Sequence, residues 1–231
     1  MRIAQTLSRF AAAFAAISAL TGLAGGRTTQ AATTVPNARA VYVAIGDSFT
    51  QGVGTHQPST ESFPALLARH LPHHARFLNL GVAGFTAEDA RINELPKALA
   101  ARVTLTTVWL GTNDVHNGIS TSTFKSGLGS ILRALHRNHV RVFVATLPNF
   151  KIVPVAVGDP SFSVQGRADN AVIVALAARY GATVVDVYSA SPSLWGHHNL
   201  VTSDGIHLTA QGYSALADLF HGVMHAQGAL P

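Results

Sequence analysis

Short apolar runs alternate with helical patterns along this chain, and that alternation limits its fold more than any other feature. The runs are near-continuous in valine, leucine, isoleucine and phenylalanine, which is typical of strands covered on both faces. They lie at residues 41–45, 76–80, 103–110, 140–146 and 183–187. Helical patterns lie between and after them, at residues 63–70, 87–99, 121–139, 165–180 and 210–225. This order predicts an α/β protein, a three-layer α/β/α sandwich with a five-stranded parallel sheet.

The first 31 residues differ in composition from the rest. Arg2 and Arg9 precede an apolar run from Phe10 to about Ala24, which is the build of a secretory signal peptide. The run is shorter than the roughly 20 residues that span a bilayer, so we expect no stable membrane anchor after cleavage. An uncleaved signal anchor and an organelle transit peptide are the alternatives. We expect cleavage after Ala31, a secreted or periplasmic location, and one domain over residues 32–231.

Charge and residue usage exclude several kinds of site. The net charge of +5 comes partly from three arginines of the leader, and no basic run interleaved with aromatic residues suggests a nucleic-acid groove. Cysteine is absent, which excludes disulfides and thiolate ligands. We expect no metal and no other cofactor, because five clustered histidines lack acids or thiols at ligand spacing and are interpreted as surface residues. These are His70, His73, His74, His197 and His198.

A serine stands where the first predicted strand gives way to a loop, in the sequence Gly46-Asp47-Ser48. The tripeptide is a weak signal by itself, because any turn favours these residues. Three further polar segments follow the second and third predicted strands or precede the last helix. They are residues 79–86 (NLGVAGFT), 111–114 (GTND) and 204–207 (DGIH). Parallel sheets bind ligands at the carboxyl ends of their strands, so we expect the first three segments to meet there.

His207 with Asp204 could activate the hydroxyl of Ser48. A serine is a poor nucleophile until a base takes its proton, and the base needs an acceptor on its other ring nitrogen. Asp-x-x-His is a weak signal alone, because Asp218 and His221 repeat the spacing inside the last predicted helix. There we expect both side chains on a solvated face.

Acyl transfer also needs donors for the negative oxygen of its tetrahedral intermediate. The backbone N–H groups of Ser48 and Gly84 and the side-chain amide of Asn113 would supply three. Glycine at position 84 would let the backbone approach a substrate closely. Gly81 competes for this place, and Asn113 taken alone could be an ordinary turn residue.

Together, the four segments resemble the SGNH, or GDSL, hydrolase family over residues 40–213. The resemblance implies a flavodoxin-like α/β/α fold. By matching motifs it implies Ser48 as nucleophile, His207 as base and Asp204 as its orienting partner. It further implies an oxyanion hole formed by Ser48, Gly84 and Asn113.

The chain departs from the family name at one position, where Phe49 replaces the leucine of G-D-S-L. That position is not chemical, so the departure leaves the implied roles intact. The G-x-S-x-G elbow, H-E-x-x-H, the Walker loop and G-x-G-x-x-G are all absent, which removes the main rival enzyme classes.

Two loops, at residues 147–162 and 189–203, could border a substrate. Candidate lining residues are Phe150, Ile152, Val153 and Trp195. Packing over the sheet edge is an equal alternative for the first loop, and Trp195 could stack a sugar or cap an acyl chain.

We therefore predict a serine esterase for carboxylic esters of short to medium acyl chain, working through an acyl-enzyme. The same machinery would serve lipase, thioesterase or lysophospholipase activity. The alternatives are a carbohydrate O-deacetylase and a non-catalytic binding module. The expected partner is a small-molecule ester or lipid, and a monomer is favoured.

Overall fold

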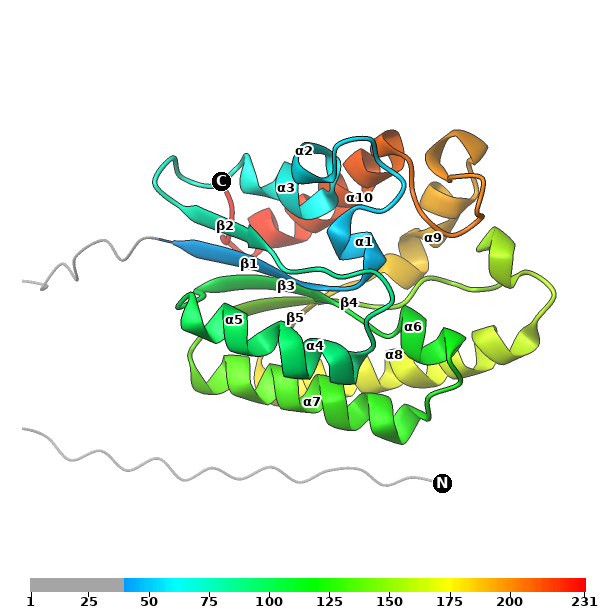
Figure 1. The fold of residues 1–231 in the computed structure, drawn as a ribbon, viewed down its shortest axis with the longest axis horizontal. Coiled ribbons are helices and arrows are strands. Elements are labelled where there is room, and N and C mark those ends of the chain that lie inside the picture. Colours follow the sequence, from blue (N-terminus) through cyan, green and yellow to red (C-terminus); the bar gives the residue numbers. More distant parts are fainter. Residues whose placement is uncertain (1–39) are drawn as a thin grey trace, which may run out of the picture. The chain divides into compact units, whose positions relative to one another are not determined.

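Five parallel strands form a single sheet in the computed structural model, which describes residues 40–231. The spatial order is β2-β1-β3-β4-β5. The strands are β1 (Val41–Gly46), β2 (Arg76–Asn79), β3 (Leu105–Trp109), β4 (Arg141–Ala145) and β5 (Thr183–Val185). The chain runs from β1 out to β2 and then returns to β3 on the other side of β1 (Figure 1). The strand order therefore reverses between β1 and β3, which is where such sheets bind ligands.

Helices cover both faces of this sheet (Figure 1). One face carries α2 (Pro58–Glu61), α3 (Phe63–Ala68), α9 (Val187–Trp195) and α10 (Ala210–Ala226). The other carries α4 (Ala87–Asn93), α5 (Leu95–Ala100), α7 (Thr121–Arg137) and α8 (Pro160–Tyr180). This arrangement confirms the predicted three-layer α/β/α sandwich with a five-stranded parallel sheet.

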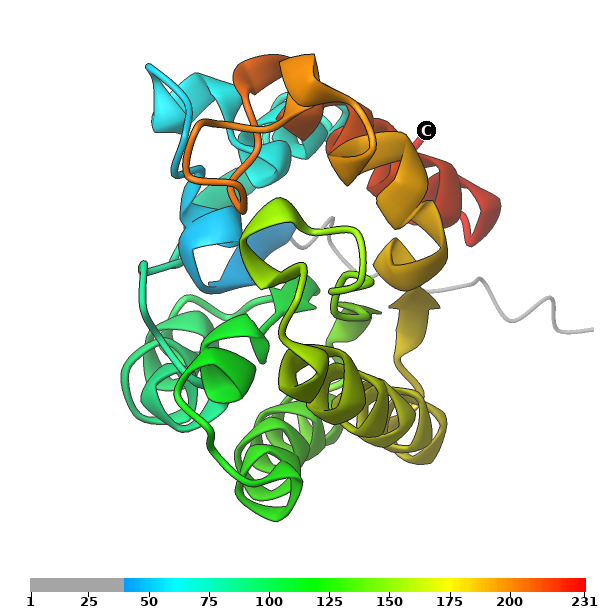
Figure 2. The ribbon, with the colours of Figure 1, turned by 90° about the vertical axis from the view of Figure 1, so that its right-hand side faces the viewer.

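The remaining short helices gather over the carboxyl ends of the strands, as Figure 2 shows from that side. They are α1 (Ser48–Gln51), α6 (Thr112–His116), η1 (Pro154–Ala156) and η2 (His198–Leu200). Every residue of β1 is buried, because both faces of that central strand are covered. The packed strands thus give a rigid base to the loops that follow them.

The predicted helix over residues 87–99 is in fact two helices. α4 ends at Asn93, and α5 carries Pro96 in its first turn. Proline lacks the N–H that a helix interior needs but is well suited to a first turn, so it starts a second helix. The break leaves Glu94 buried between the two.

Two helix starts differ from the prediction by more than the ends of the other elements do. α8 begins at Pro160 instead of residue 165, because the Asp159 side chain accepts from the Ser161 N–H and proline suits the first turn. The predicted loop over residues 189–203 is partly helical, because α9 extends to Trp195 from a cap at Asp186. In both cases an aspartate, Asp159 or Asp186, caps a helix start that the apolar pattern did not mark.

No helix within residues 40–231 is long and apolar enough to cross a membrane. The predicted leader at residues 1–31 and its cleavage point lie outside the described residues.

Candidate active site

Ser48 is the first residue of α1, directly beyond the end of β1. Asp47 caps this helix, and its Oδ1 accepts the Phe49 N–H at 3.0 Å. A Cβ at Gly46 would lie 2.1 Å from Thr50 Oγ1, so only glycine fits the turn. The Ser48 N–H, at the start of the helix, has no acceptor within it. Gly46 thus fits where a side chain would clash, Asp47 caps the helix, and Ser48 begins it.

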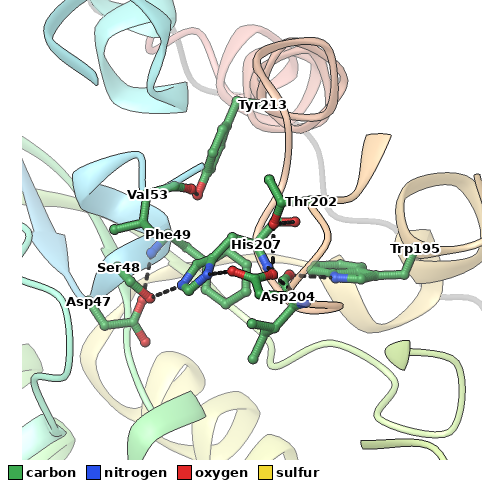
Figure 3. A network of polar contacts seen from close by, with 10 residues as sticks. Asp47, Ser48, Phe49, Val53, Trp195, Thr202, Asp204, His207 and Tyr213 are labelled. Carbon is green, nitrogen blue, oxygen red and sulfur yellow. Dashed lines mark hydrogen bonds and ion pairs between the residues drawn. The ribbon is translucent and has the colours of Figure 1, made fainter. Parts of the chain in front are cut away.

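The loop ahead of α10 brings an imidazole to this serine (Figure 3). His207 Nε2 lies 2.8 Å from Ser48 Oγ, and His207 Nδ1 lies 2.6 Å from Asp204 Oδ2. When Nδ1 donates its proton to the carboxylate, Nε2 is left to accept from the serine hydroxyl. The structure therefore joins the three residues in the order carboxylate, imidazole and hydroxyl.

Asp204 is surrounded by hydrogen-bond donors. Its Oδ1 accepts from Thr202 Oγ1 at 2.6 Å and from the N–H groups of Ile206 and His207, each at 3.0 Å. Partial burial acts to raise the pKa of Asp204, but these donors and the imidazole together hold that pKa well below its usual range. The carboxylate therefore stays ionised and directed at His207 at neutral and mildly acidic pH.

Aromatic side chains pack next to the imidazole of His207. The rings of Phe49 and His207 are 5.6 Å apart between centroids, and Phe49 stacks on Trp109 at 4.5 Å. Trp195 meets the edge of Phe49 at 5.9 Å, and its Nε1–H donates to the Ile206 carbonyl at 2.8 Å. Phe49 thus has a packing role beside the base.

Trp195 is only 4% exposed, and its single donor is already used within the protein. This placement corrects the prediction that Trp195 stacks a sugar or caps an acyl chain. The sequence showed an aromatic residue near the site but could not show that α9 turns it inward.

Gly84 lies in a loop that is tied to α1, and Asn113 lies in α6 and is tied to that loop. The Ala83 N–H donates to Gln51 Oε1 at 2.7 Å, and Asn113 Nδ2 donates to the Phe85 carbonyl at 2.9 Å. One N–H of the Asn113 amide remains after that bond. Gly84 has a φ of +84°, which favours glycine, and its N–H donates to no acceptor within residues 40–231.

Gly81, the competing glycine, serves packing. Its N–H donates to Asn79 Oδ1 at 3.0 Å, and a Cβ there would lie 2.6 Å from the Gln51 nitrogen. Because that N–H is already bonded, the structure favours Gly84 over Gly81 as a donor to a substrate.

Two of the predicted acyl-lining residues are in the core. Phe150 and Val153 are buried, and only Ile152 is partly exposed. Their burial corrects Phe150 and Val153 as lining candidates and favours the stated alternative, packing over the sheet edge. The exposed large apolar side chains of this segment are instead Val155 and Val157, which are 58% and 61% exposed.

The turn η1 that carries Val155 rests against the loop of the base. The Val155 N–H donates to the Gly205 carbonyl at 3.2 Å. A Cβ at Gly205 would lie 3.1 Å from that same nitrogen, which is tighter than ordinary contact. The exposed valines therefore stand beside the segment that holds Asp204 and His207.

The second Asp-x-x-His pair has other surroundings. The ring of His221 is 4.2 Å from that of His70, and its Nε2 lies 3.1 Å from the Pro231 carbonyl oxygen. The five histidines interpreted as surface residues are all exposed. Among residues 40–231, no three histidine or acidic side chains are placed to hold a metal ion.

Two grooves open elsewhere on the molecule. One of about 790 Å³ lies along α8 and the start of α9, where Asn170, Val174 and Tyr188 are part of its lining. Another, of about 460 Å³, is lined by Lys151, Val164 and Arg167 among others. Neither includes Ser48 or His207, so groove size does not mark the site where the hydrogen-bonded groups meet.

Residues 44–215 match the model of the GDSL-like Lipase/Acylhydrolase family. None of the proteins with curated descriptions matches the chain.

Several solved structures share the fold. TesA has a TM-score of 0.68 and 20% identity, covering 80% of this chain and 98% of that chain. The lipase/acylhydrolase from Enterococcus faecalis has a TM-score of 0.66 and 21% identity, covering 83% and 97%. The acetyl xylan esterase AlAXEase has a TM-score of 0.65 and 17% identity, covering 79% and 98%. The structural likeness shows the fold, and the family match spans most of the sequence. The chain therefore belongs to the GDSL-like lipase/acylhydrolase family.

Proposed function

We propose that this protein is a serine esterase that hydrolyses carboxylic esters of short to medium acyl chain through an acyl-enzyme. One observation carries the proposal: Asp204, His207 and Ser48 are joined by hydrogen bonds of 2.6 and 2.8 Å. A carboxylate, an imidazole and a hydroxyl in this order activate the hydroxyl for attack on a carbonyl.

In the first half-reaction, Ser48 Oγ attacks the ester carbonyl carbon while His207 Nε2 takes the hydroxyl proton. The tetrahedral intermediate collapses, the bond to the leaving alcohol breaks, and the imidazolium gives that alcohol its proton. Asp204 keeps Nδ1 protonated and stabilises the imidazolium. In the second half-reaction, water attacks the acyl-serine with His207 again as base, which releases the carboxylic acid and restores Ser48.

Three donors are proposed to bind the negative oxygen of the intermediate. They are the N–H groups of Ser48 and Gly84 and the remaining N–H of the Asn113 side-chain amide. The Asn113 amide is held by the Phe85 carbonyl, so it would need no rearrangement when charge develops. Loss of one such donor typically costs about 10²–10³-fold in kcat.

The exposed valines beside the base support an acyl substrate. Val155 and Val157 offer apolar surface on the turn that rests against Gly205. Burying apolar surface of this kind stabilises a bound acyl chain by about 25 cal/mol per Å². The burial of Trp195 removes the sequence support for a carbohydrate O-deacetylase.

The leader's composition supports secretion of the enzyme, which we also propose. The mass of the N-terminal peptide, measured on protein recovered outside the producing cell, would test this. A mature start near Ala32 is expected, and retention of residues 1–31 in that material would contradict cleavage.

Initial rates on nitrophenyl esters of increasing acyl length, with acetylated sugars beside them, test the proposed activity. Wild type should turn over the acyl series, and Ser48→Ala should not. Val155→Ser and Val157→Ser should move the preference toward shorter chains, while Val174→Ser, an exposed valine of α8, should not. Activity on acetylated sugars alone would indicate a deacetylase, and no turnover by folded protein would favour a binding module.

A further inference from the structure

A buried tyrosine of α10 joins the two segments that carry Ser48 and His207. Tyr213 is fully buried, and its hydroxyl donates to the Val53 carbonyl at 2.8 Å (Figure 3). Val53 lies just beyond α1, and its N–H donates to the Ser48 carbonyl at 3.0 Å. Tyr213 lies in the first turns of α10, which begins just after His207.

Two hydrogen bonds therefore cross between the same two parts of the chain. The bond between His207 and Ser48 spans 159 residues of sequence, and the bond between Tyr213 and Val53 spans 160. The first involves the groups proposed to react, and the second does not. We infer that Tyr213 is a positioning residue, whose bond to Val53 holds His207 at the distance where Nε2 can take the proton of Ser48.

The neighbouring glycine shows how closely the two segments approach. Gly54 has a φ of +100°, and a Cβ there would lie 2.5 Å from the Leu208 carbonyl oxygen. It would also lie 3.3 Å from His207 Cβ. Glycine lets the segment beyond α1 lie against the loop of the base, and the Tyr213 hydroxyl fastens the two where they meet.

The Tyr213 hydroxyl does not itself take part in proton transfer. Burial raises its pKa well above the ordinary value, so it stays protonated at any working pH. Its proton is directed at a backbone carbonyl and not at Ser48, His207 or Asp204. An effect of this hydroxyl on the rate must therefore act through the position of His207 relative to Ser48.

Tyr213→Phe tests the inference, because it removes one oxygen and keeps the ring. With a short-chain nitrophenyl ester, kcat should fall by about tenfold and KM should stay within about twofold, since the lost contact holds the base and not the substrate. Tyr42→Phe is the matched control. Tyr42 is also buried, and its hydroxyl contacts Thr107 Oγ1 at 2.9 Å inside the sheet. This control should lose stability and keep its kcat.

A second background separates positioning from a general structural role. If Tyr213 acts through His207, then Tyr213→Phe should change the residual rate of a His207→Ala enzyme by less than about twofold. An equal loss in both backgrounds would overturn the inference, and so would an unchanged kcat in folded Tyr213→Phe. If that variant does not fold, Gly54→Ala should give the same fall in kcat, and a wild-type kcat there would count against the inference.

The inference rests on the proposed function, and the two can fail separately. Full activity of Ser48→Ala or His207→Ala would overturn the proposed function itself. Loss of activity in both, with wild-type rates in Tyr213→Phe, would overturn only the positioning role.

Discussion

Carboxyl groups lie on both sides of Ser48, and the two sides differ in how they treat charge. Asp204, on the side of the imidazole, is 46% exposed and accepts three hydrogen bonds on Oδ1 and one on Oδ2. Behind the serine, Glu94 Oε2 accepts the Gly46 N–H at 2.8 Å, and Asp47 accepts the Phe49 N–H at 3.0 Å. Both of these carboxyls are buried.

The pKa values follow from this contrast. Donors hold the pKa of Asp204 well below its usual range, even though partial burial opposes them. Burial raises the pKa of Asp47 to about 7 and that of Glu94 to about 8, because one backbone donor does not replace the lost water. Negative charge is therefore kept beside His207, where it stabilises an imidazolium, and is suppressed behind the nucleophile below about pH 7.

Asp204→Asn removes the negative charge beside His207 and should have the largest effect. The amide keeps the shape but no longer holds Nδ1 as a donor, so we expect kcat to fall by about 10³–10⁴-fold. Steady-state rates on a short-chain ester, with circular dichroism as a check of folding, measure this. Retention of more than a tenth of the wild-type kcat would contradict the role proposed for Asp204.

Glu94→Gln replaces a buried carboxyl by an amide that cannot ionise, and it should change stability more than activity. In the unfolded chain Glu94 loses its proton near its ordinary value of 4.5, whereas the folded protein keeps it up to about 8. Its contribution to stability is therefore present at low pH and is lost as pH rises through that window. The glutamine variant should lose less stability between pH 5 and 9, by on the order of 1.4 kcal/mol for each unit of pKa shift.

Urea unfolding of wild type and Glu94→Gln at pH 5, 7 and 9 measures this difference. Glu88→Gln is the control, because Glu88 lies on the exposed face of α4 and pairs with Arg91 at 2.6 Å. Its stability curve should run parallel to that of wild type. Parallel curves for Glu94→Gln as well would show that Glu94 ionises normally in the folded protein.

Thr202→Val tests whether donors lower the pKa of Asp204, because it removes one donor and leaves the His207 side chain unchanged. The pKa of Asp204 should rise toward its ordinary value, which an NMR titration of the folded enzyme would measure. Near neutral pH the remaining donors keep Asp204 ionised, and we expect rates within about threefold of wild type. Thr202→Ser keeps the hydroxyl and should keep the wild-type pKa of Asp204. The same Asp204 pKa in the valine and serine variants would exclude this role of Thr202.

Asp218→Ala and His221→Ala should have the smallest effect. They repeat the Asp-x-x-His spacing inside α10, but His221 contacts His70 and the Pro231 carbonyl. Rates indistinguishable from wild type are expected on the same ester. A loss comparable to that of His207→Ala would mean that the wrong pair had been chosen.

The sequence predicted most of what sets this site, because parallel strands bring their carboxyl ends to one edge wherever the chain leaves them. Ser48, Gly84 and Asn113 each follow such a strand, so their loops could be placed without coordinates. The predicted place of Asp218 and His221 inside the last helix also separated that pair from Asp204 and His207, which precede the helix.

What the sequence could not give is the direction of side chains in irregular segments. Phe150, Val153 and Trp195 were candidates for lining the site, and all three turn inward. Tyr213 looked like any apolar position of an amphipathic helix, because no pattern shows where its hydroxyl points. Glu94 lay within a predicted helix, and only the break at Pro96 leaves it buried behind Gly46.

The central claim is that Ser48 carries the acyl group, and the most direct test is the intact mass of enzyme quenched during turnover of a short-chain nitrophenyl ester. We expect wild type to gain the mass of one acyl group, placed by peptide mapping on Ser48. Ser48→Ala should gain none and should not turn over the ester. An acyl group on another residue, or wild-type turnover by Ser48→Ala, would contradict the account.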